Sequence, residues 1–218
     1  MPEEAKPQPA AGDTPDPLSG TAAASAPTGD AAAALEHPAI RVLKDDFNGT
    51  GPLRATAFRG DVTVVCEPGD LHALLTFLKS DPRLAFDFLS DIAGVDYLNY
   101  PKPRGGGPTG RFGVVYNLAS TERHHRLLVK VLLNPALDTH GIDDDPRLHL
   151  PTVTDLWAGA EWLEREVFDM LGIRFDGHPD LRRILTWESY PAHPLRKDYP
   201  VRGRGEREDY RVVDRDSA

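Results

Sequence analysis

The sequence predicts an α+β fold in which a small antiparallel or mixed sheet with packed helices is followed by an extended, proline-rich C-terminal segment. In the stretches 112–118 and 127–133 apolar residues recur at every second position, which is the period of a strand. In the stretches 71–78 and 156–171 they recur at three- and four-residue spacing, which is the period of a helix with one buried face. Because hairpins with interspersed helices replace strict strand–helix alternation, a largely antiparallel sheet is expected.

Three parts are expected along the 218 residues: a low-complexity tail (1–37), an α+β domain (38–172) and an extended, partner-binding C-terminal segment (173–218). The tail consists mainly of Ala, Pro, Gly, Ser, Thr and Asp and has no aromatic residue, so it is expected to be disordered. It lacks the basic start and apolar core of a secretory signal and the arginines of a mitochondrial transit peptide. A cytosolic and most simply bacterial origin is therefore expected.

The composition excludes several function classes. A net charge of −9 argues against a general nucleic-acid binder. The single cysteine, Cys66, permits no internal disulfide and no cysteine cluster for zinc or iron–sulfur chemistry. No apolar run approaches the ~20 residues that a membrane-spanning helix needs. We therefore expect a soluble chain with no metal and no cofactor of its own.

Turn and capping residues set the bounds of the first elements. A short helix is expected from Pro38, ended by the turn at 48–51. Asp70 is expected to cap a second helix, which Asp81 and Pro82 end. The turn at 59–61 predicts a hairpin. Strands are expected at five places rich in apolar, β-branched or aromatic residues: 55–58, 62–66, 86–97, 112–118 and 127–133.

A third helix follows, with its start near Thr152 or Thr154 as cap and its end at Gly172 in a left-handed conformation. Its apolar stripe consists of Leu156, Ala160, Leu163, Val167, Met170 and Leu171. This stripe is expected to face the core.

The charged side of this helix predicts a contact surface. Glu161, Arg165 and Asp169 follow each other at i, i+4 spacing, which is typical of a solvated ladder of alternating sign. Trp162 projects among them, where its ring suits a protein interface better than water. Glu164 sits beside the apolar stripe and is expected to need a cationic partner, namely one of the two adjacent arginines that follow the helix.

Beyond Gly172 the chain combines prolines with many apolar and aromatic residues and has no sustained period, so it is expected to lie extended along its own surface or a partner's. Arg182 and Arg183 would face opposite ways in such a stretch, one toward the chain and one toward the partner. The residues expected at the partner interface are Trp162, Arg165, Arg182, Arg183, Trp187, Tyr190, Arg196, Lys197 and Tyr199.

Other conspicuous residues have simpler interpretations. The glycine-rich stretch 101–110 lacks the order of a phosphate loop and is expected to be a hairpin loop. His124 and His125 would point to opposite faces of a strand, whereas His178 and His193 sit in turns and are expected to bind backbone groups rather than metal. The acidic run 143–145 lacks the pattern of a calcium loop and is expected to be a solvated turn.

Three ordered motifs also resemble one protein family. The runs 162–173 (WLEREVFDMLGI), 177–185 (GHPDLRRIL) and 193–200 (HPLRKDYP) resemble the 30-kDa-type subunit of NADH:quinone oxidoreductase, respiratory complex I. Upstream, 91–97, 111–118 and 153–157 also resemble segments of that family, so the likeness covers 38–200. Leu171 stands where an aromatic is common, and Ala192 where glycine is expected.

The resemblance implies a structural and assembly subunit in the peripheral arm of a proton-translocating NADH:quinone oxidoreductase. It implies contact with the 49-kDa-type subunit, which helps to form the quinone pocket, and with other peripheral-arm subunits. NADH, flavin, iron–sulfur clusters and quinone would be bound elsewhere in the complex, and this chain would have no catalytic residues. It would lie on the cytoplasmic side of the bacterial cell membrane, attached only through the complex.

Two alternatives stay open at this point. Membrane-bound hydrogenases and F420-linked dehydrogenases use similar subunits, so the electron donor is less certain than the role. A freestanding metallohydrolase would instead use His178, His193 and Asp180 as a histidine/carboxylate metal site. A stoichiometric metal in the purified chain would favour the hydrolase.

Overall fold

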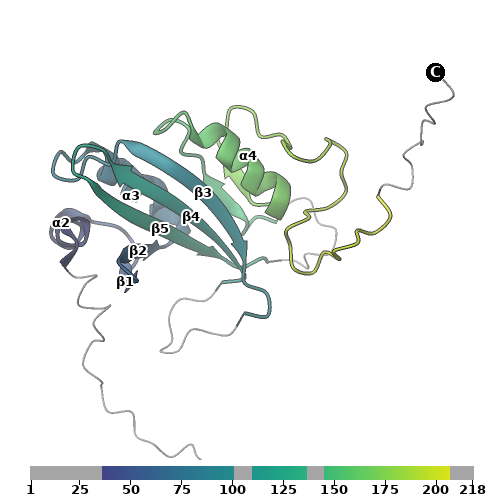
Figure 1. Cartoon of the computed structure of the whole chain (residues 1–218), viewed down its shortest axis with the longest axis horizontal. Coiled ribbons are helices and arrows are strands. Elements are labelled where there is room, and N and C mark those ends of the chain that lie inside the picture. Colours follow the sequence, from purple (N-terminus) through teal and green to yellow (C-terminus); the bar gives the residue numbers. More distant parts are fainter. Residues whose placement is uncertain (1–35, 101–109, 137–144, 207–218) are drawn as a thin grey trace, which may run out of the picture.

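The computed structural model describes residues 36–100, 110–136 and 145–206. Its main sheet has five strands in the order β1-β2-β5-β4-β3 (Figure 1). The strands are β1 (Arg54–Phe58), β2 (Asp61–Cys66), β3 (Phe88–Asp96), β4 (Phe112–Ser120) and β5 (His125–Leu133). The predicted α+β class and the five strands are therefore confirmed, while the tail and most of the glycine-rich loop lie outside the described residues.

Strand pairing makes this sheet mixed. β1 and β2 form an antiparallel hairpin through Arg59 and Gly60, whose φ angles of 52° and 92° are those of the two-residue turn that matches strand twist. β3, β4 and β5 form an antiparallel meander. β2 pairs with β5 in parallel, from Thr63↔Leu128 to Cys66↔Val131. One parallel pair thus joins the hairpin to the meander.

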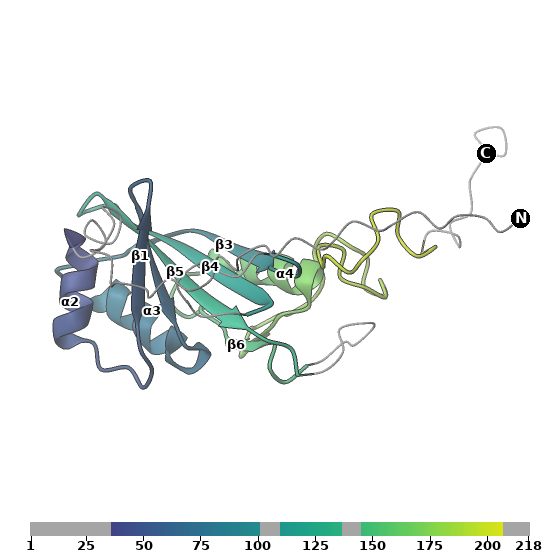
Figure 2. The same ribbon diagram turned by 90° about the horizontal axis from the view of Figure 1, so that it is seen from below.

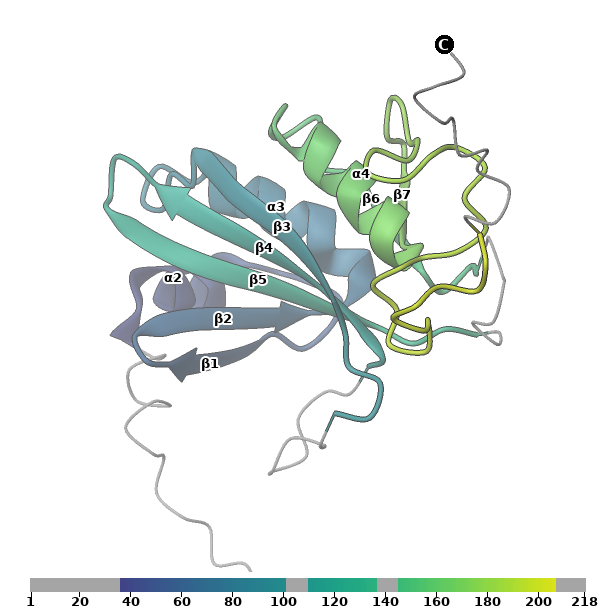
Figure 3. The same cartoon turned by 45° about the vertical axis from the view of Figure 1, so that its right-hand side comes forward.

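Three helices cover one face of the sheet: α2 (Pro38–Asp46), α3 (Leu71–Ser80) and α4 (Ala160–Leu171). In Figure 3, α2 and α3 lie behind the strands and α4 lies beside β3. The strand residues facing them are buried, among them Phe112, Val114, Tyr116 and Leu118 of β4, and Leu127, Val129, Val131 and Leu133 of β5. Side chains on the opposite face of β4 and β5 are only partly buried, which accounts for the alternation seen in the sequence.

Helix α4 packs closely on β3 and connects two further strands. A Cβ added at Gly94 of β3 would lie 2.3 Å from Leu171 and 3.1 Å from Val167, so the absence of a side chain lets the helix approach the strand. Strands β6 (His149–Pro151) and β7 (Arg174–Asp176) flank α4 in the chain and pair in parallel. Ile173 and Phe175 are consequently buried in the core, and the segment without helix or strand begins after Asp176.

Four details differ from the expectations. Helix α4 begins at Ala160 with no side-chain cap, because turns occupy the preceding residues. Asp70 does not cap α3; its carboxylate accepts hydrogen bonds from the backbone N–H groups of Thr50 and Gly51, at 2.9 and 2.7 Å, and so fixes the loop after α2. His124 lies in the turn before β5 with a φ of 55°, so it shares no strand with His125.

The fourth difference concerns the acidic run. Asp145 is buried, and its carboxylate accepts from the backbone N–H groups of Ala136 and Arg147, at 2.7 and 2.9 Å. It is therefore a structural turn residue rather than a solvated one, while Asp143 and Asp144 lie outside the described residues. No helix in the described part of the chain is long and apolar enough to cross a membrane.

Candidate functional site

The stretch 178–199, which we call the strap, follows the outer side of α4 and then reaches the end of the sheet. It lies at the opposite end of the molecule from α2 in both Figure 1 and Figure 2. The charged side of α4 and the backbone carbonyls at its C-terminal end provide the groups that hold the strap.

Asp169 is the central attachment point. Its side chain is fully buried and accepts hydrogen bonds from three successive backbone N–H groups of the strap, at Ile184, Leu185 and Thr186 (2.7–3.0 Å). The Thr186 hydroxyl adds a bond of 2.5 Å and the Arg183 guanidinium one of 2.7 Å. Burial raises the pKa of this carboxyl, but the hydrogen bonds outweigh burial and lower the pKa to about 2. Asp169 is therefore not part of a solvated ladder, and its carboxylate binds the strap of its own chain.

The N-terminal half of α4 holds the start of the strap. Arg165 donates from Nε to the Arg182 carbonyl and from Nη2 to the Arg183 carbonyl, at 3.0 and 3.1 Å. His178 contacts the Glu161 carbonyl through Nε2, at 3.0 Å, and accepts from the Asp180 N–H at Nδ1. Since Nδ1 accepts, Nε2 carries the proton and donates to the carbonyl. Glu161, Arg165 and Asp169 thus lie along the strap rather than forming an ion-pair ladder.

At the C-terminal end of α4 the strap satisfies carbonyl oxygens that have no partner within the helix. Leu195 donates its backbone N–H to the Met170 carbonyl, and Arg196 donates from Nε to the Leu171 carbonyl at 2.7 Å. His193 contacts the Asp169 carbonyl through Nδ1 at 2.9 Å. Both turn histidines therefore bind backbone groups, as expected.

A charged cluster connects the strap to the sheet. Arg111, at the start of β4, bonds to Asp96 of β3 at 3.1 Å and to Asp198 of the strap at 2.8 Å. Asp96 is buried and also accepts from the backbone N–H of Lys197 at 2.9 Å. The Arg196 guanidinium lies 5.5 Å from the ring centre of Phe112, within cation–π range. The C-terminal end of the strap is therefore held on the sheet by charge-assisted contacts.

These contacts separate the residues expected at a partner interface into two groups. Arg183 and Arg196 have a different role from the one expected, because their guanidinium groups bind Asp169 and Leu171 of their own chain. Arg182 is exposed and pairs with Asp180 at 2.6 Å, so the two adjacent arginines do face different ways. Lys197 is exposed as well.

The three aromatic residues of the strap form a cluster of their own. The ring centres of Trp187 and Tyr190 lie 4.5 Å apart in an edge-to-face arrangement, and the hydroxyls of Tyr190 and Tyr199 are 2.5 Å apart. All three side chains are half-buried. Such rings contribute contact area and, because they pack on each other, lose little freedom on docking.

Large apolar side chains remain exposed on α4 and the strap. Trp162 is 67% exposed, Leu185 64% and Leu195 58%, and Val201 after the strap is fully exposed. The outward position of Trp162 agrees with the sequence analysis, whereas Leu185 and Leu195 were missed because an irregular segment has no period that indicates its outer side. Together with Arg182 and Lys197, these side chains form the surface most suited to a protein partner. We call it the strap surface.

Among the described residues, no arginine pairs with the buried carboxyl of Glu164. Its side chain is completely buried and accepts from the Thr152 hydroxyl at 2.6 Å and from the Val153 N–H at 2.8 Å. Burial raises the pKa of Glu164 to about 7, although these two hydrogen bonds lower it in part. The expected pairing with Arg182 or Arg183 is wrong, because Asp169 binds Arg183 and Asp180 binds Arg182.

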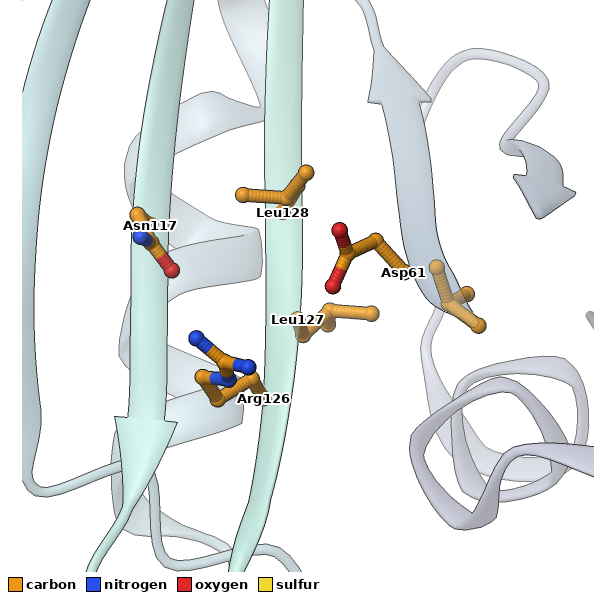
Figure 4. Close-up of a pocket in the computed structure, with 6 residues that line it drawn as sticks. Asp61, Asn117, Arg126, Leu127 and Leu128 are labelled. Carbon is orange, nitrogen blue, oxygen red and sulfur yellow. The ribbon is translucent and has the colours of Figure 1, made fainter. Parts of the chain in front are cut away.

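The described residues offer no alternative chemical centre. Within 36–100, 110–136 and 145–206, no group of three or more His, Cys, Asp or Glu side chains could hold a metal ion. A pocket of about 250 Å³ lies where β2 and β5 begin to pair, lined by Asp61, Val62, Asn117, Arg126, Leu127 and Leu128 (Figure 4). Helix α4 packs on β3, and β4 lies between β3 and the β2–β5 pair in the sheet, so the pocket is not part of the strap region.

The fold is similar to that of a known respiratory protein. It matches a chain in the structure of the membrane-bound sulfane sulfur reductase, an archaeal respiratory membrane complex, with a TM-score of 0.55. The two chains are 21% identical, and the match covers 80% of this chain and 90% of that chain. This likeness defines the fold class alone: a mixed sheet with helices on one face.

The sequence relationships are closer. The family model of the respiratory-chain NADH dehydrogenase 30 kDa subunit matches residues 64–205, so the chain belongs to this family. It is 44% identical over 162 residues to an NADH-quinone oxidoreductase subunit of Acidithiobacillus ferrooxidans, covering 74% of this chain and 73% of that protein. With the equivalent NADH-quinone oxidoreductase subunit of Geobacter metallireducens it shares 42% identity over 173 residues, covering 79% and 94%. The resemblance noted in the sequence is confirmed.

Proposed function

We propose that this chain is the 30-kDa-type subunit of a membrane-attached, proton-translocating NADH:quinone oxidoreductase and contributes structure and assembly surface rather than catalytic residues. In this role it takes part in electron transfer from NADH to quinone as a component of the peripheral arm, on the cytoplasmic side of the bacterial cell membrane. Flavin, iron–sulfur clusters and quinone are bound by other subunits. Membership of the 30 kDa subunit family supports this role.

The strap surface is the proposed binding site for the 49-kDa-type subunit. The observation that carries this proposal is that the motif-rich strap is fixed by buried contacts to Asp169, Asp96 and the end of α4, yet leaves Trp162, Leu185 and Leu195 in water. Large exposed side chains on a rigid support lose little entropy on binding and are typical interface anchors. Arg182 and Lys197 add the outward charges that orient a partner.

The other functions have less support. A hydrolase that uses His178, His193 and Asp180 would need free imidazole nitrogens, but His178 uses both nitrogens for backbone contacts and His193 Nδ1 contacts a carbonyl. The corresponding subunits of a membrane-bound hydrogenase or an F420-linked dehydrogenase would have the same structural role with another electron donor. The curated relatives are named for NADH and quinone, which favours the first proposal.

Replacement of Trp162 by alanine is expected to weaken assembly and leave the fold intact. Removing a central aromatic anchor costs about 2 kcal/mol of binding, or roughly thirtyfold in affinity. Because the ring is 67% exposed in the free chain, its loss should change the free energy of unfolding by less than ~0.5 kcal/mol. The measurement is the amount of 49-kDa-type subunit that copurifies with the tagged chain from detergent-solubilised membranes.

Phe58→Ala is a matched control. Phe58 is also 67% exposed but lies on the edge strand β1, away from α4. The Phe58→Ala variant should copurify with the same partners as the unaltered chain. Equal losses of partner in the two variants would mean that the strap surface is not the site, and copurification without any component of an NADH-linked complex would overturn the proposed function itself.

A further inference from the structure

A buried carboxyl lies beneath α4, separate from the strap surface. Glu164 points inward from the helix and is completely buried, together with the side chain of His178, whose Nε2 lies 4.0 Å from the carboxyl. Because His178 Nδ1 accepts from the Asp180 N–H, the imidazole ring supplies no positive charge to the carboxyl. The Tyr116 hydroxyl of β4 is also buried and has no hydrogen-bond partner in the described part of the chain, while burial raises the pKa of this phenol well above its ordinary value. Neither His178 nor Tyr116 therefore supplies a positive charge to the carboxyl.

The remaining ionisable neighbours also disfavour a negative charge. Asp155, in the turn before α4, raises the pKa of Glu164 by electrostatic repulsion. Cys66 of β2 acts on Tyr116, and burial raises the pKa of its thiol to about 12, so it stays neutral. No lysine or arginine among the described residues forms a salt bridge with Glu164. The ionised carboxyl therefore lacks, among the described residues, the cationic partner that usually stabilises a buried carboxylate.

Two hydroxyls connect this carboxyl with the half-exposed loop before the helix. Thr152 contacts Glu164 at 2.6 Å, and the hydroxyls of Thr152 and Thr154 are 3.0 Å apart, with either able to donate. If the carboxyl is ionised, Thr152 donates to it and accepts from Thr154. If the carboxyl is protonated, it donates to Thr152, which then donates to Thr154. The pair of hydroxyls can thus serve both forms by reversing its hydrogen bonds.

We propose that Glu164 is an internal proton-binding site, connected to solvent by the hydroxyls of Thr152 and Thr154, and that its proton occupancy controls how firmly α4 is held on the sheet. The neutral form is compatible with its apolar surroundings, whereas the ionised form must be accommodated by one hydroxyl and one N–H. Because α4 also carries the strap, the proton state affects the support of the strap as well as the core.

The direction of the pH dependence follows from linkage. Burial raises the pKa of Glu164 from an ordinary 4.5 to about 7, so the folded chain binds the proton more tightly than the unfolded chain. The associated stability is fully present below pH 4.5 and is lost as the pH rises through 7. A variant that cannot ionise at position 164 should not lose stability in this pH range for this reason.

Urea unfolding of the full chain at pH 5 and pH 8 tests the proposal. Between these pH values the unfolding constant of the unaltered chain should rise roughly seventyfold relative to Glu164→Gln. The glutamine carries no charge; its amide oxygen can accept from the Val153 N–H and its NH2 can donate to the Thr152 hydroxyl, as a protonated carboxyl would. Glu161→Gln is the matched control, since Glu161 is a half-exposed glutamate on the same helix. The ratio of its unfolding constant to that of the unaltered chain should be the same at pH 5 and pH 8. A constant ratio for Glu164→Gln as well would overturn the proposal.

A second measurement needs no variant at this position. NMR of the unaltered chain with ¹³C-labelled glutamate carboxyls should show one resonance that titrates near pH 7, and titration of all glutamates below pH 5.5 would contradict the proposal. Thr152→Val removes the hydroxyl donor at constant shape and should move this midpoint to higher pH. An unchanged midpoint would overturn the role assigned to the two hydroxyls.

Discussion

Asp169→Ala is expected to release the strap and to cost about 3–5 kcal/mol of folding free energy. The substitution removes the acceptor for three backbone N–H groups and a hydroxyl, and it leaves the Arg183 guanidinium in a poorly solvated place without its partner. Urea unfolding measures the loss. Hydrogen exchange should show in addition that the amides of 184–186 lose protection while those of β4 keep theirs.

Glu166→Ala provides the control on the same helix. Glu166 is exposed, and its removal should change stability by less than ~0.5 kcal/mol. Similar losses for the two variants would show that the strap contributes little to the fold. Rapid exchange of 184–186 in the unaltered chain would lead to the same conclusion and would favour a strap that orders only on a partner.

Gly172→Ala is expected to be the second severe substitution, at about 3 kcal/mol. Gly172 ends α4 with a φ of 74°, a conformation that costs an alanine about 1–2 kcal/mol. An added Cβ would also lie 2.3 Å from the Arg196 guanidinium and 2.6 Å from the His193 ring, both of which are buried. The methyl group therefore strains the backbone and displaces the strap at the point where it caps the helix.

The chain contains a glycine that separates these two costs. Gly177 has a φ of 82°, but a Cβ there would meet only the Thr152 methyl, at an ordinary 3.4 Å. Gly177→Ala should thus be destabilised only by the cost of placing an alanine at a positive φ, without a steric clash. The difference between the melting temperatures of the two variants measures the steric contribution of the strap, and equal melting temperatures would mean that Arg196 and His193 move aside without cost.

Periodic parts of the chain could be predicted from the sequence. Alternation in β4 and β5 and the turn at Gly60 indicate their structure locally, because a strand or a tight turn depends on residues close in sequence. The left-handed end of α4 at Gly172 was predicted for the same reason. The start of α4 was not, because turns occupy most of 154–159 and leave Thr152 and Thr154 outside the helix.

The attachments of the strap could not be read in this way. Asp169 occupies a position that helical spacing assigns to solvent, and only the fold brings the N–H groups of 184–186 to it. An irregular segment offers no period, so Arg183 and Arg182 cannot be told apart by sequence even when opposite directions are expected. Glu164 shows the same limit, because its partners lie in the loop before the helix.

The parallel pairing of β2 with β5 also has a kinetic consequence. The meander β3–β4–β5 is built from neighbouring strands, whereas β2 can join β5 only after the whole chain between Cys66 and His125 has closed into a loop. Loop closure costs entropy before any contact compensates for it, so we expect the pairing of β2 with β5 to form last during folding. Pulse-labelling hydrogen exchange should then find β4 amides protected earlier than those of β2, and simultaneous protection would argue against this order. Until the two units join, the edge of β5 is open to strands of other chains, and newly made copies of the protein are at that stage most prone to aggregate.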